Sequence, residues 1–450
     1  MRKQILAWLL PCMLVAAPVA QAASVETTDE LKTLKEQVRL LQQKIDKMET
    51  RLQASEKQPA AAAPAEPVVQ AAESAQPQNT TRSDANVFNP QISMVLNGSY
   101  RAFSHNPATF AVPGFALGDS AGLGDRGFGI NESELNFAAN VDNLFYADST
   151  LSLPRTGGIN VEEAYFQTLA LPAGLTVKAG RFFSGIGYIN QFHPHHDDFI
   201  DRSLANRVFL NSTFAGDGIQ VRWLAPTDTY FELGSELLRG DRYPGGGAAL
   251  RGAGSWDVFA HVGGDVGFSN SWRAGLSWLS TKPLGRSSFD NTGAVTGTFD
   301  GNSQLLIGDL VWKWAPNGNP YDTNFKFQTE LFQQQEKGMF ANAGSPAASY
   351  SGRHWGGYAE AVYQFTHGWD IGIRHSEVFA RNTGAAVVPG SVLDTLGFRP
   401  KRTSLVLGYA NSEFSRFRLQ FSRDQSRPVT DNQVALQYLM LIGAHGAHQF

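Results

Sequence analysis

The chain contains a single cysteine, Cys12, among 450 residues. One cysteine cannot form an intramolecular disulfide, so no disulfide framework holds the fold. Charged residues make up only 17%, and the formal net charge is -4 with no basic stripe, which excludes the charge pattern of a nucleic-acid-binding protein. Beyond the N-terminus no apolar run approaches the roughly 20 residues of a membrane-spanning helix. These absences leave β-structure as the way in which this chain could cross a membrane.

Glycine and aromatic residues are abundant instead, with 45 Gly, 30 Phe and 9 Trp. High glycine and aromatic content with low overall hydropathy is typical of a transmembrane β-barrel, in which only one face of each strand meets lipid. A soluble β-sandwich or propeller also alternates along its strands. It explains neither charged residues on one face of nearly every strand nor long loops on one side only.

The N-terminus, residues 1–22, is predicted to be a secretory signal peptide. Its start is basic, residues 5–17 form an apolar run, and Ala20-Gln21-Ala22 is a cleavage site of the A-x-A type. Cleavage before Cys12, as in a lipoprotein, would leave a shorter apolar run. Cleavage after Ala22 leaves a mature chain without cysteine.

Residues 23–57 carry a heptad pattern typical of a coiled coil, and residues 58–88 form a Pro- and Ala-rich linker. The strict spacing of three and four favours self-association of the helix over packing against another surface. We expect this stem to lie in the periplasm, and its core residues do not fix the number of chains. The apolar seam consists of Leu31, Leu34, Val38, Leu41, Ile45, Met48 and Leu52.

Residues 89–450 are predicted to form an all-β transmembrane barrel of about sixteen antiparallel strands. Long and short gaps alternate between the candidate strands, as they must when one rim carries tight turns and the other long loops. Within 415–422, Phe417, Leu419 and Phe421 alternate with arginine and glutamine, which must face a wet interior because charge in hydrocarbon is costly. The predicted strands are 91–102, 131–141, 144–153, 160–170, 174–183, 216–225, 228–238, 255–265, 270–279, 303–314, 322–334, 354–366, 368–379, 401–411, 413–424 and 433–450. The predicted long connections include 103–130, 184–215, 280–302, 335–353 and 381–400.

The signal peptide, the alternating strands and the terminal Phe450 together resemble a bacterial outer-membrane porin of about sixteen strands. The resemblance implies a homotrimer in the outer membrane of a Gram-negative bacterium, with Phe450 in the signal read by the barrel-assembly machinery. His448 departs from the bulky apolar residue that is usual near that end. The stem is similar to that of the phosphate-selective porin O/P group, and the sequence around 184–215 is similar to outer-membrane proteins linked to zinc supply.

The connection 184–215 follows the fifth strand, and the porin resemblance implies that such a loop folds into the lumen and narrows it. Imidazole and carboxylate groups suit Zn²⁺, Cu²⁺ or Ni²⁺, so His193, His195, His196 and Asp197 are a candidate site for transient metal binding. The same run could instead form a solvated turn, or the aspartates and arginines could pair and rigidify the constriction. The candidate constriction residues are His193, His195, His196, Asp197, Asp198, Asp201, Arg202 and Arg207.

Charged residues on the predicted inward faces are candidates for the pore wall. Opposed basic and acidic groups would set a transverse field that orients polar solutes, although they could also serve only to solvate a wet lumen. No lysine lies between Lys178 and Lys282. The phosphate-selective porins carry a lysine cluster in this loop, so its absence argues against phosphate selectivity. The candidates are Arg101, Lys178, Arg222, Lys326, Arg374, Arg416, Arg418, Glu134 and Glu330.

These features favour a passive diffusion channel for small hydrophilic solutes or ions that requires no cofactor. Transient binding of zinc or another divalent ion would bias it toward such ions. The alternatives are an outer-membrane metal (zinc) uptake receptor, which would need a plug domain inside about 22 strands, and a structural envelope tether. An enzyme is not expected, and no H-E-x-x-H motif is present.

Overall fold

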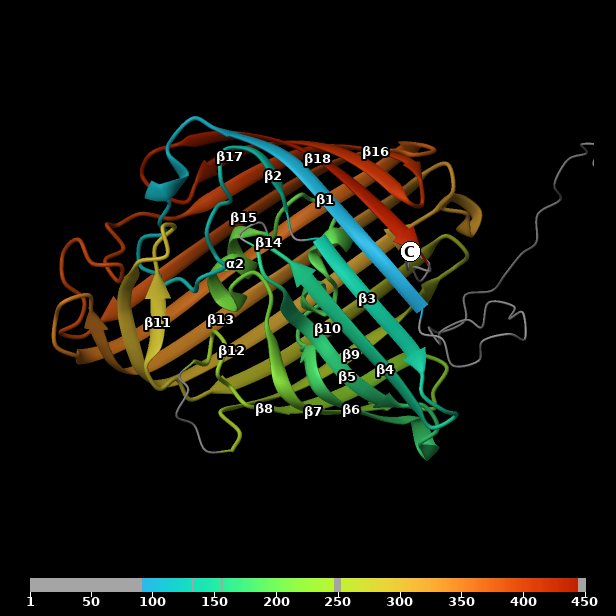
Figure 1. The fold of residues 1–450 in the computed structure, drawn as a ribbon, viewed down its shortest axis with the longest axis horizontal. Helices are drawn as coiled ribbons and strands as arrows, with labels where there is room; N and C mark the ends of the chain where they lie inside the picture. Colours follow the sequence, from blue (N-terminus) through green and yellow to red (C-terminus); the bar gives the residue numbers. More distant parts are fainter. Residues whose placement is uncertain (1–90, 132, 155–156, 247–251, 444–450) are drawn as a thin grey trace, which may run out of the picture. The chain divides into compact units, whose positions relative to one another are not determined.

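The computed structural model describes residues 91–443 with three gaps, and its strands close into one barrel (Figure 1). At the seam, β1 (Gln91–Phe103) pairs antiparallel with β18 (Asp431–Gly443), and Ser99 lies opposite Gln437. The described sheet therefore closes on itself, which removes the unpaired edges of an open sheet. The gaps are residues 132, 155–156 and 247–251. The predicted signal peptide (1–22), stem (23–57), linker (58–88) and terminal Phe450 lie outside the described residues.

Eighteen strands occur in the described part of the chain, and sixteen of them follow one another around the barrel. β2 (Gly127–Ile130) is a short strand paired with β1, and β11 (Arg286–Phe289) is a short partner of β12. The predicted sixteen-stranded antiparallel barrel is confirmed. Between β1 and β18 the long strands are β3 (Ser133–Asn140), β4 (Phe145–Leu153), β5 (Asn160–Thr168), β6 (Leu175–Phe183), β7 (Ala215–Leu224), β8 (Tyr230–Leu238), β9 (Ser255–Val266), β10 (Asn270–Thr281), β12 (Val295–Trp314), β13 (Asn324–Asn342), β14 (Ala348–Thr366), β15 (Trp369–Thr383), β16 (Lys401–Ser412) and β17 (Ser415–Gln425).

Side chains alternate between an apolar exterior and the interior of the barrel. On β17, Phe417, Leu419 and Phe421 are 45%, 47% and 45% exposed, whereas Arg418 and Gln420 between them are buried. An apolar exterior on a closed antiparallel barrel is the arrangement of a transmembrane β-barrel. No helix among the described residues is long and apolar enough to cross a membrane.

The predicted long connections 280–302 and 335–353 are largely strand. On β13 the alternation continues past Leu331, but the outward positions become polar with Gln333, Gln335 and Lys337. These strand ends extend beyond the apolar belt, so the sequence there lacks the signal of a lipid-spanning strand. As a result, β13 covers 335–342 and β14 covers 348–353 of the predicted loop 335–353, and β12 covers 295–302 of the predicted loop 280–302.

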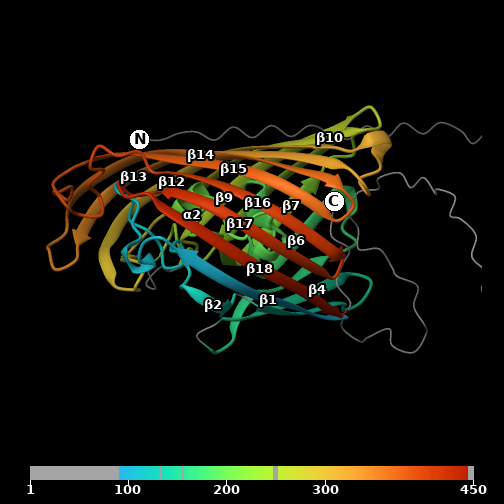
Figure 2. The same ribbon diagram turned by 90° about the horizontal axis from the view of Figure 1, so that it is seen from above.

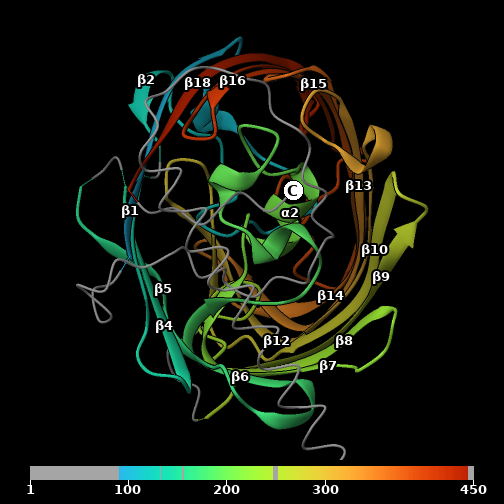
Figure 3. The ribbon, with the colours of Figure 1, turned by 90° about the vertical axis from the view of Figure 1, so that its right-hand side faces the viewer.

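The strands of the barrel run obliquely (Figure 2). The segment between β6 and β7, residues 184–214, folds back into the interior of the barrel (Figure 3). It contains α2 (Leu204–Leu210). The Ser203 side chain accepts a hydrogen bond from the Asn206 N–H at the start of α2, and Asn211 ends it in the left-handed conformation at φ 54°. We call 184–214 the constriction loop. The short 3-10 turns are η1 (Pro107–Thr109), η2 (Pro172–Gly174), η3 (Ile189–Gln191), η4 (Pro194–His196) and η5 (Pro316–Gly318).

One sector of the interior is a hydrophobic core rather than a wet lumen. Every residue of α2 is buried, and its apolar side chains pack against inward side chains of the barrel wall. The expectation of a polar lumen is wrong for this sector, because apolar residues occupy inward positions next to polar ones on the same strands. The core includes Phe182, Phe209, Leu210, Phe214, Leu238, Phe259, Leu279, Leu305, Ile307 and Phe332.

Candidate pore constriction

The two ends of the constriction loop are held together where it enters the barrel. The Ser184 N–H donates to the Phe214 carbonyl at 3.1 Å. The side-chain amide of Asn190 donates to the carbonyls of Ser184 and Phe214, each at 2.9 Å, and its oxygen accepts from the Phe214 N–H at 2.6 Å. Asn190 is almost fully buried. Its hydrogen bonds hold the first and last residues of the loop next to each other at the barrel wall.

Aromatic contacts hold α2 against one sector of the wall. The ring of Phe209 stacks on Phe332 of β13, with centroids 5.3 Å apart and planes at 6°. Phe115, from the long connection after β1, meets Phe209 edge-on at 6.1 Å. Such ring pairs stabilise a core beyond the area that they bury. Two loops distant in sequence therefore share one core inside the barrel.

Glu330 of β13, predicted as a pore-wall residue, holds the main chain of the constriction loop. Its Oε1 atom accepts hydrogen bonds from the N–H groups of Tyr188 at 2.6 Å and Ile189 at 3.3 Å. Its Oε2 atom accepts from the side-chain amide of Asn206 in α2 at 3.0 Å. A single wall carboxylate thus satisfies donors on both η3 and α2.

Asp201 joins the constriction loop through arginines to β15 and β16, far around the barrel from β6 and β7, where the loop begins and ends. Its carboxylate lies 3.0 Å from Arg207 of α2, 2.7 Å from Arg374 on β15 and 2.7 Å from Arg402 on β16. Burial works to raise the pKa of Asp201. The three guanidinium groups outweigh burial and hold that pKa well below its usual range. The carboxylate therefore stays charged and anchors the loop to two strands.

The two preceding aspartates are also paired. Asp197 lies 2.8 Å from Arg202 within the loop, and Asp198 forms an ion pair with Lys326 on β13. Burial raises the pKa of Asp197 to about 6 despite its arginine neighbours. For Asp198, burial is outweighed by Lys326, and the pKa is lowered. Arg418 on β17 donates to the main-chain carbonyl of Asp197.

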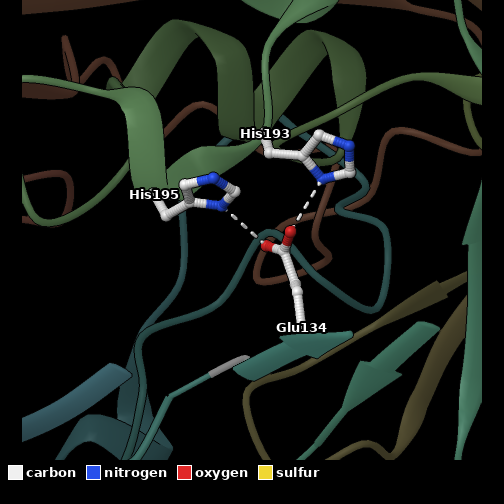
Figure 4. A group of neighbouring side chains, drawn as sticks. All are labelled: Glu134, His193 and His195. Carbon is white, nitrogen blue, oxygen red and sulfur yellow. Dashed lines mark hydrogen bonds and ion pairs between the residues drawn. The ribbon is translucent and has the colours of Figure 1, made fainter. Parts of the chain in front are cut away.

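His193 and His195 of the loop also contact the wall, where both lie against Glu134 of β3 (Figure 4). His193 Nδ1 lies 3.2 Å from Glu134 Oε2, and His195 Nδ1 lies 3.0 Å from Glu134 Oε1. Two glutamates of β5 also reach His193, with Glu162 Oε2 3.2 Å from Nδ1 and Glu163 Oε2 2.9 Å from Nε2. Burial lowers the pKa of His193, but hydrogen bonds to the three carboxylates outweigh it and raise that pKa well above its ordinary value.

The structure brings together two of the four predicted metal ligands. His193 and His195 share Glu134, which the sequence placed on the pore wall instead. The ring centroid of His196 lies 4.2 Å from that of His195, but His196 is not part of the group around Glu134. Asp197 lies with Arg202 instead of the histidines.

The sequence reasoning missed Glu162, Glu163 and Arg402 as site residues. Glu162 and Glu163 are neighbours in a predicted strand, so alternation places one of them inward. Arg402 shares its face of β16 with buried Ser404 and Val406. Strict alternation could therefore have found Arg402 and one of the two glutamates, but it could not have found both glutamates or named the partners of any of them.

Many of the predicted wall residues are engaged by neighbours. Where the neighbour is a carboxylate, as it is for Arg222 and Arg416, the ion pair reduces the charge that would otherwise set a field across the lumen. Arg222 lies 3.6 Å from Glu232, Arg416 lies 3.1 Å from Asp370, Lys178 lies 4.3 Å from the ring centroid of Tyr165, and Arg101 donates to Asn131 at 3.5 Å.

A narrow pocket separates the constriction loop from the wall on the charged side of the barrel. Arg101 of β1, Arg207 of α2 and Arg402 of β16 line it together with Asp201. The lining holds three guanidinium groups and one carboxylate and is positive, and Asp424 of β17, 3.7 Å from Arg402, offsets part of that charge. Its other lining residues are Phe103, Leu123, Ile200, Gln420, Ser422, Gln433, Val434 and Ala435.

Residues 118–122, Gly-Asp-Ser-Ala-Gly, fit the G-x-S-x-G pattern of a hydrolase nucleophile. That pattern requires a strand, a sharp turn and a helix, but this segment lies in the irregular connection between β1 and β2. The Ser120 hydroxyl donates to Asp119 at 3.2 Å, and the Ser120 main chain contacts Asn211 and Ser212. The segment supports the constriction loop and lacks the geometry of a nucleophile elbow.

The closed sheet, the apolar exterior and the anchored inner loop define a sixteen-stranded transmembrane β-barrel. Solved structures with a similar fold include the loop L8 deletion mutant of OmpT, an outer membrane protein of Vibrio cholerae, at 9% identity over 79% of this chain and 99% of that chain, with a TM-score of 0.49. The outer membrane channel DcaP of Acinetobacter baumannii is 10% identical over 78% of this chain and 97% of that chain, with a TM-score of 0.47. Pseudomonas putida OprB is 11% identical over 79% and 94%, also with a TM-score of 0.47. At these identities the likeness concerns the fold alone.

No family model matches the chain. A protein of Aquifex aeolicus (strain VF5), described as an uncharacterized protein, is 30% identical over 346 residues, which is 72% of this chain and 70% of that protein. The chain belongs to the same family as this Aquifex protein.

Proposed function

We propose that the protein is an outer-membrane channel for passive diffusion of small hydrophilic solutes or ions. The observation that carries this proposal is the constriction loop, which lies inside a closed barrel and is tied to β3, β13, β15 and β16 by buried charged side chains. A loop fixed in this way sets the width and charge of whatever passage the barrel retains.

The passage would run on the charged side of the loop, because the other sector is a packed apolar core. The pocket between Arg101, Arg402 and Asp201 marks that side. Its excess of guanidinium groups would favour anions. The bias toward divalent metal ions that the histidine run predicts would then come from the separate group around His193 and His195.

The proposal includes a homotrimer, insertion by the barrel-assembly machinery and a periplasmic stem. These features follow from the heptad seam at 31–52, the terminal Phe450 and the porin resemblance. Analytical ultracentrifugation of the mature protein in detergent, with and without residues 23–57, tests the trimer and the part that the stem plays in it.

Single-channel recording of the purified protein in planar bilayers tests the channel itself. Deleting 193–198 should change the conductance, since it removes His193, His195 and Asp198, the loop residues that bind Glu134 and Lys326 of the wall. The matched control is deletion of 344–346, from the short turn between β13 and β14, which should leave the conductance unchanged. A purified, folded protein that leaves bilayers impermeable would refute the proposal.

A metal uptake receptor is the second candidate, and the grouping of Glu134, His193 and His195 is the observation that favours it. A receptor should bind the metal tightly and transport it only with energised cells, whereas a channel conducts in a simple bilayer. A structural tether is distinguished by deletion of 31–52, which would weaken the envelope while leaving the current through each barrel intact.

A further inference from the structure

Three groups that a metal ion could bind converge between the constriction loop and the wall. Glu134, His193 and His195 each offer one ligand atom, and these atoms lie within 4.8 Å of one another (Figure 4). The two nitrogen-to-oxygen distances to Glu134 are 3.2 Å and 3.0 Å. Ligand atoms around a tetrahedral zinc ion, with bonds of about 2.0–2.1 Å, are separated by about 3.3 Å. Small side-chain rotations would therefore admit an ion between them.

The surroundings of His193 have the second layer that protein metal sites use. While Nδ1 faces Glu134, Nε2 lies 2.9 Å from Glu163 Oε2. A carboxylate on the far nitrogen fixes the tautomer and orientation of a ligating imidazole and makes it more basic. Glu162 Oε2 lies 3.2 Å from the same Nδ1 atom and adds a further carboxylate next to the group.

The charge balance of the group also favours a cation. Three carboxylates, from Glu134, Glu162 and Glu163, surround two imidazoles. The side chains of these three glutamates are only 5–13% exposed. Two imidazoles could not balance three carboxylates even if both were protonated, so the group carries excess buried negative charge, which is costly. A divalent ion would compensate that charge and leave both imidazoles neutral, the form in which they ligate.

We propose that Glu134, His193 and His195 bind one divalent transition-metal ion of the zinc type, and that this ion ties the constriction loop to β3. Two imidazole nitrogens and a carboxylate form a ligand set that suits Zn²⁺. Binding itself does not depend on the channel function proposed above. Only the expected effect of the ion on current rests on that function.

The test is calorimetric titration of the untagged, full-length mature protein in detergent, after removal of metals with a chelator, with zinc chloride as the only ligand. One ion should bind per chain. Glu134→Gln, which removes a ligand 59 residues away from the histidine run in sequence, should weaken binding by about 100-fold, and Glu163→Gln should weaken it by about 10–100-fold through the second layer. His105→Ala, in an exposed loop outside the group, is the matched control and should bind as the parent does.

Absence of saturable binding would overturn the proposal. Unchanged affinity in Glu134→Gln would do the same, because the histidine run alone would then account for the metal. Folding of each variant is checked by heat-modifiable migration on gels, and His195→Gln replaces Glu134→Gln if the latter does not fold. Titration with cobalt chloride gives a second readout, since intense visible absorption marks tetrahedral coordination and should be lost in the same variants. If binding occurs but zinc leaves the current unchanged, the site stands and its link to the channel fails.

Discussion

Arg402 of β16 lies 2.7 Å from Asp201 of the constriction loop. The two residues are far apart in the sequence, and Arg402 also lies 3.7 Å from Asp424 on β17. Both partners are largely shielded from water, with side-chain exposures of 4% and 12%. Removing one partner of such a pair leaves a buried charge without compensation, which costs more than the pair itself contributes. A single substitution of Asp201 should therefore strongly weaken the attachment of the loop to the wall.

Asp201→Asn should destabilise the folded barrel by about 3 kcal/mol, because three arginines lose a common carboxylate. The measurement is urea unfolding in lipid vesicles. Asp217→Asn is the matched control, because Asp217 lies 2.6 Å from Arg181 with side-chain exposures of 36% and 30%. An exposed pair of this kind contributes about 0.2–1 kcal/mol. Equal effects in the two variants would contradict the role given to Asp201.

The stabilisation from Asp201 should persist in mild acid. Its pKa in the folded protein is held well below the ordinary value, so its contribution is complete above the unfolded pKa of about 3.9 and is lost as the pH falls through the folded pKa. The difference in unfolding free energy between the parent and Asp201→Asn should therefore be equal at pH 7 and pH 5. It should shrink only below about pH 4. A difference that disappears between pH 7 and pH 5 would contradict the pairing.

The apolar anchor can be tested apart from the charged ones. Phe209 is fully buried against Phe332, and Phe209→Ala should cost about 3–5 kcal/mol through lost contacts and a cavity. Because α2 would loosen, single-channel records should show larger and noisier currents. Phe268→Ala, at a residue that is 94% exposed, is the control. Quiet currents at the parental level in Phe209→Ala would show that the core does not position the loop.

The barrel could be predicted from the sequence because the period of two is a local property. The alternation of Phe417, Leu419 and Phe421 with polar residues requires only that one strand face meets lipid. The ends of β13 could not be predicted in the same way. Past Leu331 the outward residues become polar, so the amino-acid pattern of a strand that extends into water does not differ from that of a loop.

The partners inside the barrel could not be predicted, because they depend on closure of the whole sheet. The histidine run indicated metal chemistry, and His193 and His195 do lie together, but the carboxylate between them comes from β3. Asp197 was expected beside them and instead lies with Arg202. Sequence spacing gives only the separation of residues along the chain. Which residues form a ligand set or an ion pair depends on the path of the loop inside the barrel and on the strands that it passes.

The positive pocket yields the last prediction. Arg101→Gln removes one of three guanidinium groups around the pocket at Asp201 and should shift the reversal potential in asymmetric KCl toward cations. A unit positive charge about 4 Å away in water stabilises chloride by about 1 kcal/mol and destabilises potassium by about the same amount, so the chloride-to-potassium permeability ratio should fall by about 30-fold. Arg423→Gln makes the same chemical change at an exposed outward position of β17 and should leave the ratio unchanged. Equal shifts in both variants would mean that overall charge, rather than this pocket, sets the selectivity, and no shift in either would place the passage elsewhere in the barrel.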